Sequence, residues 1–388
     1  MPELAPAPTR PASNAVLPLP SLSGLRFIAA LQVFAFHAYV GQWFRSHAAD
    51  QRYFAMLGTG GVAVSFFFVL SGFVLTWSAR PTDTARRFWR RRFWRIAPNY
   101  VVAWVLALIL LLLTTGAPTA SQSVPNLFLV QSWVPRSKVF FSMDWPSWSL
   151  SCEVFFYLCF PVLLRIANRL RPATLWPLAV GAVALIWLVP VVAGLLDSGG
   201  RPLQGVPPHQ FWFVYVFPPV RMLDFVLGIL LARIVMSGRW IPVGLPLAMA
   251  ATVAGYVAQC YVPTKYGFSA ATIIPLALLI PAAATADLKG TWSPLRGNVL
   301  VRLGELTYAF YLLHQLVLRY AGWLIGAGTT YPTPVAIALI LGLLLVTVVA
   351  SWLLYTLVEE PCMRRFSRAR RRPEVTATAT PAPSEVTA

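Results

Sequence analysis

The chain has 388 residues, of which 57% are hydrophobic and only 11% are charged. Such a composition leaves too little polar surface to cover a water-soluble globule, which excludes a soluble multidomain protein. The net charge of +18 is carried mainly by short basic blocks between apolar runs. This pattern is typical of membrane topology and not of a nucleic-acid-binding face, so we expect a lipid bilayer as a partner and no nucleic acid.

Long uncharged runs mark the elements that we expect to cross the bilayer. Residues 173–196 and 334–357 contain no charged side chain, and runs of this length can span a hydrocarbon core of about 30 Å as helices. They lack the polar and apolar alternation of a transmembrane β-barrel. We therefore predict an all-α fold, a polytopic membrane helix bundle with about ten transmembrane helices. The ten spans are expected at residues 22–42, 58–78, 96–114, 148–166, 173–196, 214–236, 241–262, 268–287, 302–326 and 333–357.

The segments outside these spans are short or polar. Residues 124–134 are apolar but too few to cross alone, so we expect a re-entrant or interfacial piece there. The Pro- and Ala-rich residues 1–20 lack the features of a cleaved signal peptide, and we expect a retained, disordered cytoplasmic tail. Residues 367–388 are expected to form a second disordered cytoplasmic tail, which leaves residues 21–366 as the transmembrane domain.

Lys and Arg in the connecting loops indicate how the spans are oriented. With the amino terminus inside, 23 of the 31 Lys and Arg residues lie in the tails and inner connections, against six in the outer loops. Seven of the inner residues fall in the single connection that ends at Arg95. We therefore predict a multi-pass protein of the cell membrane with both termini cytoplasmic.

The first span carries two ionisable residues, Arg26 and His37. Such residues are costly inside a span, so each is a functional hypothesis, with structural pairing as the alternative. Their separation of eleven residues returns to within about 20° of one helix face and covers roughly 16 Å along the axis. Arg26 is expected near the cytoplasmic boundary and His37 in the outer half. The imidazole of His37 suits a general base, but a hydrogen bond to a neighbouring helix explains it equally well.

A basic block from Arg86 to Arg95 precedes the third span. Anchoring at an anionic lipid surface accounts for most of its charges. Arg92 and Arg95 lie closest to the span at i and i+3, so they share one face if the helix extends back to include them. Such a face fits a phosphate-bearing ligand.

Glu153 follows Trp148 in a segment that we place in the outer half of the fourth span. A buried carboxylate usually needs a partner, and His37 at a similar predicted depth is the candidate. The alternative is an ordinary helix-capping carboxylate near the membrane interface. We favour the functional interpretation.

Three further candidate residues lie in later spans. Arg221 and Asp224, at i and i+3, most simply form a structural ion pair, with a contact to substrate as the functional alternative. His314 lies near the middle of the ninth span, where it either lines a polar, substrate-binding cavity or bridges helices. No metal site is expected, because the four histidines are far apart in the sequence and no pair has ligand spacing.

Several short blocks, in this order and at these spacings, resemble the acyltransferase 3 family of membrane O-acyltransferases. The resemblance runs from about Leu19 to Arg365. The usual aspartate before the first glycine of such proteins is Ser23 here. The blocks are Ser23-Gly24-Leu25-Arg26 followed by His37, Phe67 to Phe73, Arg91 to Pro98, Trp148 to Glu153, Arg221 to Gly228, Tyr308 to His314, and Val358-Glu359-Glu360-Pro361.

This resemblance implies an acyl-CoA-dependent O-acyltransferase, with residues 21–366 as the acyltransferase domain. It implies that acyl-CoA is a co-substrate and that no cofactor is bound permanently. Carried over to this sequence, Arg26, Arg92 and Arg95 hold the phosphates of CoA at the cytoplasmic face. His37 is then the general base, and Glu153 orients it or the acceptor.

This resemblance implies that the acceptor is a hydroxylated macrolide or a glycan. The opening from Leu19 and the compact size look like the subgroup that acylates a macrolide or its attached sugar, and we favour that acceptor. O-acetylation of a cell-surface or secreted polysaccharide is the alternative. The Ala-, Arg- and Pro-rich composition indicates an actinobacterial source. A membrane transporter or flippase is the alternative of another class, although no repeated halves are visible in the sequence.

Overall fold

The computed structural model describes residues 17–58, 60–80, 83–326 and 328–367, and no β-strand occurs within them. Eight helical segments in these ranges are long and apolar enough to cross a membrane. The chain is therefore a polytopic membrane helix bundle, which confirms the predicted fold class. The two tails predicted at 1–20 and 367–388 lie almost wholly outside the described residues.

Ten principal helices coincide with the ten predicted spans. They are α1 (Pro20–Val40), α3 (Gly61–Trp77), α4 (Ala85–Thr114), α7 (Trp148–Arg169), α8 (Leu175–Ala193), α10 (Pro218–Met236), α11 (Leu245–Ala258), α13 (Ala270–Leu288), α15 (Thr307–Ile325) and α16 (Thr333–Leu354). Two of them are not among the eight long apolar segments. The first, α11, is short, and α15 carries several polar side chains along its length.

Shorter helices connect the principal ones. They are α2 (His47–Leu57), α5 (Ala120–Leu127), α6 (Ser137–Phe140), α9 (Pro208–Phe211), α12 (Thr264–Gly267), α14 (Asn298–Glu305) and α17 (Glu360–Cys362). The segment expected to be re-entrant or interfacial forms α5 and a following 3₁₀ turn. Buried Gln131 and Ser132 in that turn donate hydrogen bonds to the carbonyl oxygens of Ser147 and Trp148, at 3.1 and 2.7 Å. The segment therefore covers the start of α7.

The basic block is the beginning of a helix, not a separate loop. Helix α4 starts at Ala85, where the side chain of Thr84 accepts a hydrogen bond from the backbone of Arg87. The predicted span begins at residue 96, because charged residues end the apolar run, and the helix extends back beyond it. Arginine nevertheless has a high helix propensity, and a capping threonine is enough to start the helix earlier. Arg92 and Arg95 are consequently one turn apart on a continuous helix.

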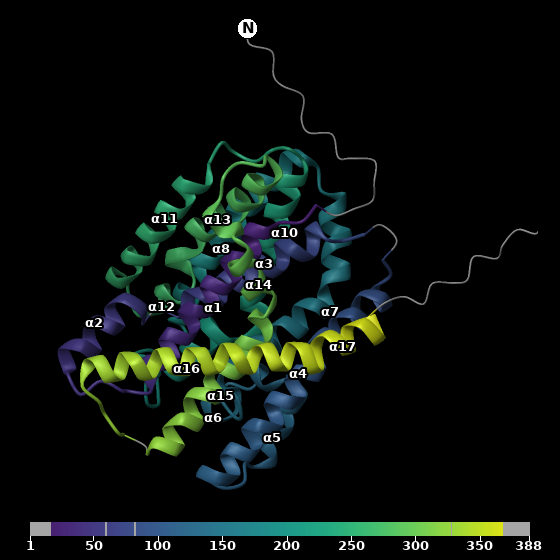
Figure 1. The fold of residues 1–388 in the computed structure, drawn as a ribbon. Coiled ribbons are helices and arrows are strands. Elements are labelled where there is room, and N and C mark those ends of the chain that lie inside the picture. Colours follow the sequence, from purple (N-terminus) through teal and green to yellow (C-terminus); the bar gives the residue numbers. More distant parts are fainter. Residues whose placement is uncertain (1–16, 59, 81–82, 327, 368–388) are drawn as a thin grey trace, which may run out of the picture.

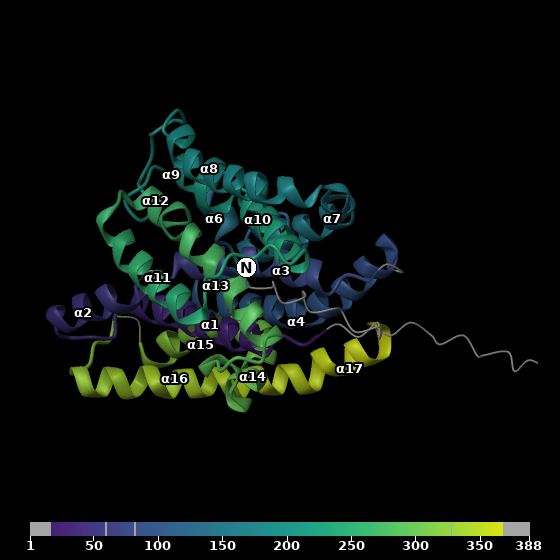
Figure 2. The same ribbon diagram turned by 90° about the horizontal axis from the view of Figure 1, so that it is seen from above.

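Helices α3 and α10 pack against each other near the middle of the bundle. In Figure 1 α1, α3 and α10 lie close together, and Figure 2 shows α16 along one edge with α8 towards the opposite edge. Gly72 of α3 faces the carbonyl oxygen of Phe225, and Gly228 of α10 faces that of Val69. A Cβ atom at either glycine would overlap the opposing backbone. The two helices therefore approach through small residues, as membrane helices commonly do.

Replacing Gly228 with Leu is expected to destabilise the bundle by about 3 kcal/mol, because α3 and α10 would have to separate. The matched control is Gly342→Leu on α16, where an added Cβ atom meets nothing within 4 Å. Thermal unfolding of the detergent-solubilised protein would measure the difference. Equal unfolding temperatures for the two variants would show that the contact between α3 and α10 contributes no stability.

Candidate active site

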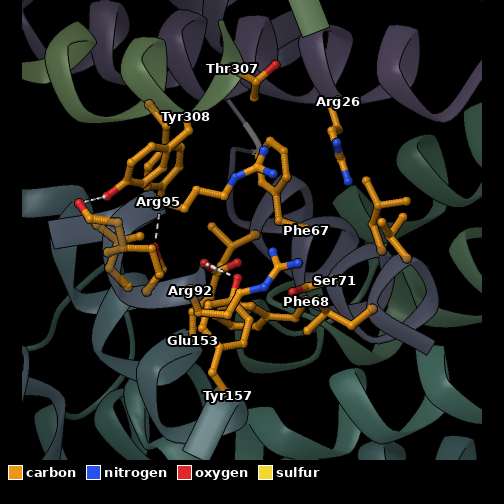
Figure 3. A pocket seen from close by; sticks show the side chains of 18 of the residues that line it. Arg26, Phe67, Phe68, Ser71, Arg92, Arg95, Glu153, Tyr157, Thr307 and Tyr308 are labelled. Atoms are coloured by element: carbon orange, nitrogen blue, oxygen red, sulfur yellow. Dashed lines mark hydrogen bonds between the residues drawn. The ribbon is translucent and has the colours of Figure 1, made fainter. Parts of the chain in front are cut away.

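A cavity of about 410 Å³ lies between α1, α3, α4, α7 and α15. Arg26 enters it from α1, and Arg92 and Arg95 enter it from α4, as Figure 3 shows. Glu153 of α7 lies in the same cavity, beside Tyr157. We call this space the arginine cavity. The structure thus brings together the three predicted donor-binding arginines and one of the two predicted catalytic residues.

In the described part of the chain, the three guanidinium groups form no close ion pair, although Glu153 and Glu305 line the same cavity. Within the described residues, none of them has a carboxylate oxygen within 4 Å or donates a hydrogen bond. Arg92 is held by stacking over the rings of Phe88 and Tyr157, at 5.6 and 5.8 Å from the ring centroids. Three half-buried cations with unused donors form a strong site for an anion that can accept several hydrogen bonds.

Two tyrosines complete the polar wall of the arginine cavity. Tyr157 donates a hydrogen bond of 3.1 Å to Glu153, four residues earlier on α7. Tyr308 donates one of 2.8 Å to the carbonyl oxygen of Ile96. The spacing of Glu153 and Tyr157 on one helix face could have indicated their pairing from the sequence, whereas the contact of Tyr308 joins α15 to α4 and has no local signal.

The start of α1 is fixed by an acidic residue from another helix. Asp287 of α13 accepts hydrogen bonds from the backbone nitrogen and the hydroxyl group of Ser21, at 2.8 and 2.7 Å. A carboxylate at a helix amino terminus compensates the free backbone donors and the helix dipole. This contact anchors α1 at the turn before Arg26, and it therefore positions that guanidinium in the arginine cavity.

His37 lines a different cavity, of about 560 Å³, which we call the histidine cavity. Its wall includes the side chains of Trp43, Gln315 and Arg319. Among the residues that the structure describes, none lines both the arginine and the histidine cavity. Arg26 and His37 thus lie on the same helix but open into separate spaces, at the two depths that their spacing predicts.

His37 pairs with His314 and not with Glu153. Nδ1 of His37 lies 3.0 Å from the carbonyl oxygen of Val33 and 3.1 Å from Nε2 of His314. The expected contact between His37 and Glu153 is therefore wrong. Glu153 instead shares the arginine cavity with Arg26 and accepts its hydrogen bond from Tyr157.

The hydrogen bonds define which nitrogen of His37 is free. Nδ1 of His314 lies 3.2 Å from the carbonyl oxygen of Phe310, so this nitrogen carries a proton and Nε2 of His314 is an acceptor. Nδ1 of His37 must then donate to both the carbonyl oxygen of Val33 and Nε2 of His314. The lone pair of neutral His37 is consequently on Nε2, where it is available to a ligand of the histidine cavity.

A short series of contacting side chains lies between the two cavities. Tyr311 lines the arginine cavity, and its ring centroid lies 5.6 Å from that of His314. The hydroxyl groups of Tyr311 and Ser149 are 2.8 Å apart. His314 in turn contacts His37 at the wall of the histidine cavity. Tyr311 and His314 therefore form the partition between the cavities.

Arg221 and Asp224 lie in neither cavity. They form a buried ion pair of 2.8 Å on α10. Arg221 also donates to the hydroxyl group of Ser65, and Ser269 donates to Asp224, at 2.7 and 3.1 Å. These contacts join α10 to α3 and to the start of α13. They support a structural role for the ion pair. A contact of Arg221 or Asp224 with substrate stays a prediction.

Asp144 is a buried acidic residue that no pattern in the sequence indicates. It precedes α7 in a loop, and neither carboxylate oxygen has a hydrogen-bond partner within the described residues. Burial raises the pKa of Asp144 to about 8, although nearby Arg319 opposes the shift. Arg319 itself donates a hydrogen bond of 2.8 Å to the carbonyl oxygen of Met143. A neutral acid is therefore expected next to the histidine cavity at pH 7.

Comparison with known proteins identifies the family. The profile of the acyltransferase 3 family, described as an acyltransferase domain, matches residues 19–356. The chain belongs to the acyltransferase 3 family. It is 42% identical to the acyltransferase MdmB of Streptomyces mycarofaciens over 372 residues, which cover 93% of this chain and 95% of that protein. With its helix bundle, the chain is a membrane O-acyltransferase.

Two other relatives of the family are more distant. Nodulation protein 10 of Rhizobium leguminosarum is 27% identical, and the alignment covers 90% of this chain and 94% of that protein. Peptidoglycan O-acetyltransferase OatA of Listeria monocytogenes is 26% identical over 58% of this chain, which corresponds to 35% of the relative. No solved structure matches the chain.

Proposed function

We propose that this membrane acyltransferase transfers an acyl group from acyl-CoA to a hydroxyl group of a macrolide or of its attached sugar. The observation that carries the proposal is the arginine cavity, which three guanidinium groups line without forming a close ion pair among the described residues. A CoA thioester supplies the phosphates that such a site binds. Its acyl end can extend towards His37, which lies roughly 16 Å further along α1.

The two sides of the reaction follow from the distribution of positive charge. The arginine cavity lies at the end of the bundle where α4 begins with its basic block. That end faces the cytoplasm under the positive-inside rule, and both termini then lie on the same side. Acyl-CoA would enter there, while the acceptor would reach the histidine cavity from the outer half of the bundle or from the lipid.

His37 acts as the general base in this proposal. Nε2 of His37 takes the proton of the acceptor hydroxyl as the oxygen attacks the thioester carbonyl carbon. The tetrahedral intermediate collapses by breaking the carbon–sulfur bond, and the proton passes from His37 to the departing CoA thiolate. Glu153, held by Tyr157 among the arginines, is proposed to position the donor and not to touch His37.

His314 is expected to fix the orientation and tautomer of His37. Replacing it with Leu should lower kcat roughly a hundredfold, because a misplaced base loses its alignment with the hydroxyl group. His314→Gln should restore part of the rate, since its amide oxygen can still accept from Nδ1 of His37. The measurement is kcat and KM for both variants in one membrane preparation. Equal rates for the two would show that His314 only fills space.

The macrolide acceptor is supported by the match along nearly the whole length of the Streptomyces acyltransferase. That relative also supports the proposed actinobacterial source. O-acetylation of a cell-surface polysaccharide is the second candidate, favoured by the similarity to a peptidoglycan O-acetyltransferase. Family membership favours an enzyme over a transporter or flippase.

Transfer of a radiolabelled acyl group by the purified protein tests the proposal. The protein in lipid nanodiscs would be mixed with labelled acetyl-CoA or longer acyl-CoA and with either a hydroxylated macrolide or a peptidoglycan fragment. Label in the macrolide alone supports the proposed acceptor, and label in the glycan alone supports the second candidate. Absence of transfer from any acyl-CoA, with a correctly folded protein, would contradict the proposed donor.

A further inference from the structure

A smaller cavity of about 240 Å³ adjoins the arginine cavity on the side of the loop between α3 and α4. The two cavities have Leu75, Ser78 and Arg92 in common. We call the smaller space the side cavity. One ligand can therefore occupy both spaces by passing Arg92.

The side cavity carries an excess of positive charge. Arg80, Arg91 and Arg165 line it together with Arg92, and Asp83 is the one acidic residue among the described residues of its wall. Asp83 is already bound by both terminal nitrogens of Arg91, at 2.8 and 2.6 Å. The guanidinium of Arg91 holds the pKa of Asp83 below its usual value, so this carboxylate stays ionised and neutralises Arg91.

The other arginines of the side cavity remain available to a ligand. Within the described residues, Arg80, Arg92 and Arg165 form no ion pair. They come from three different parts of the chain, because Arg80 follows α3, Arg92 lies on α4 and Arg165 lies on α7. Cations that converge on one small cavity from separate elements can contact one compact dianion from several sides.

We propose that the side cavity binds the 3′-phosphate at the nucleotide end of acyl-CoA, while the arginine cavity holds the pyrophosphate and the start of the pantetheine arm. This inference rests on the proposed function. The side cavity is smaller than the usual ligand pocket of 300 to 1,000 Å³, so it accommodates one end of a larger ligand. A phosphate monoester carries close to two charges, which matches Arg80 and Arg165.

The arrangement also places each end of the donor in a suitable environment. Arg80 and Arg165 are exposed, whereas the far wall of the arginine cavity contains buried side chains such as Tyr311. The highly charged nucleotide end thus stays near water, and only the less polar pantetheine arm and acyl group enter the bundle.

The test compares CoA with dephospho-CoA, which lacks the 3′-phosphate, as competitors of labelled acetyl-CoA. The full-length protein would be studied in nanodiscs of phosphatidylcholine, so that no anionic lipid competes. The variant Arg80→Gln/Arg165→Gln removes the two cations. The control Arg86→Gln/Arg169→Gln removes two charges from α4 and α7 at residues that line neither the side cavity nor the arginine cavity.

The wild-type protein is expected to bind CoA roughly tenfold or more tightly than dephospho-CoA. In Arg80→Gln/Arg165→Gln this ratio should fall towards one, with the affinity for dephospho-CoA nearly unchanged, while the control keeps the wild-type ratio. A ratio that stays at its wild-type value in the test variant, or a wild-type ratio of one, overturns the inference but leaves the proposed function intact. If neither CoA nor dephospho-CoA competes, the proposed donor fails and the inference fails with it.

Discussion

Replacing His37 with Ala is expected to lower kcat about 10²- to 10⁴-fold, which is the usual contribution of a positioned general base. The affinity for acyl-CoA should change little, because His37 lines the histidine cavity and the arginines line a separate one. The measurement is the single-turnover rate of acyl transfer in nanodiscs, together with CoA affinity by competition.

Two controls separate catalysis from folding in this experiment. His47→Ala removes an exposed histidine outside both cavities and should leave the rate unchanged. The unfolding temperature of His37→Ala should match that of the wild-type protein. A rate close to wild type in a folded His37→Ala variant would remove His37 from the mechanism and leave it as a packing residue.

The double variant Arg92→Gln/Arg95→Gln is expected to bind CoA about a hundredfold more weakly or worse. Each charged hydrogen bond to phosphate contributes roughly 1.5–3 kcal/mol, and the two effects act on one ligand. Saturating acyl-CoA should recover much of the rate, because the chemistry at His37 is untouched. Competition against labelled acetyl-CoA measures the affinity.

The control for the arginine pair is Arg87→Gln/Arg90→Gln, which removes the same charge from the exposed side of α4. It should retain CoA binding. The remaining basic residues of the block should preserve the orientation of both variants, which a tag accessible on one side of sealed vesicles would verify. Equal CoA affinity in the two variants would mean that Arg92 and Arg95 serve only as membrane anchors.

Local regularities allowed most of the fold and the donor side of the site to be predicted. The length of the apolar runs indicated where each principal helix lies. Because α4 includes Arg92 and Arg95, their i, i+3 spacing brings both side chains to one cavity. Helix α4 begins before the predicted span, since a Thr cap and helix propensity outweigh local charge there. Boundaries set by apolar length alone therefore miss charged helix ends.

The acceptor side depended on long-range geometry that no spacing reveals. His37 and His314 are 277 residues apart, and their contact of 3.1 Å depends on how α1 packs against α15. Glu153 was assigned to His37 because a membrane depth was inferred from the start of its helix. The packing of α7 against α3 and α4 places the same carboxylate among the arginines instead. Depth is a property of the packed bundle and not of one segment.

The partition formed by Tyr311 and His314 has a consequence for the cell's energy supply. A bilayer stores ion gradients, and any water-filled path through a protein dissipates them. Both side chains are buried and held by hydrogen bonds, Tyr311 to Ser149 and His314 to Phe310. The enzyme thus has polar spaces on both sides of a thin, closed wall. The two cavities do not join into one water-filled path in this structure, so an acyl group that reaches His37 from the arginine cavity must displace Tyr311 or His314.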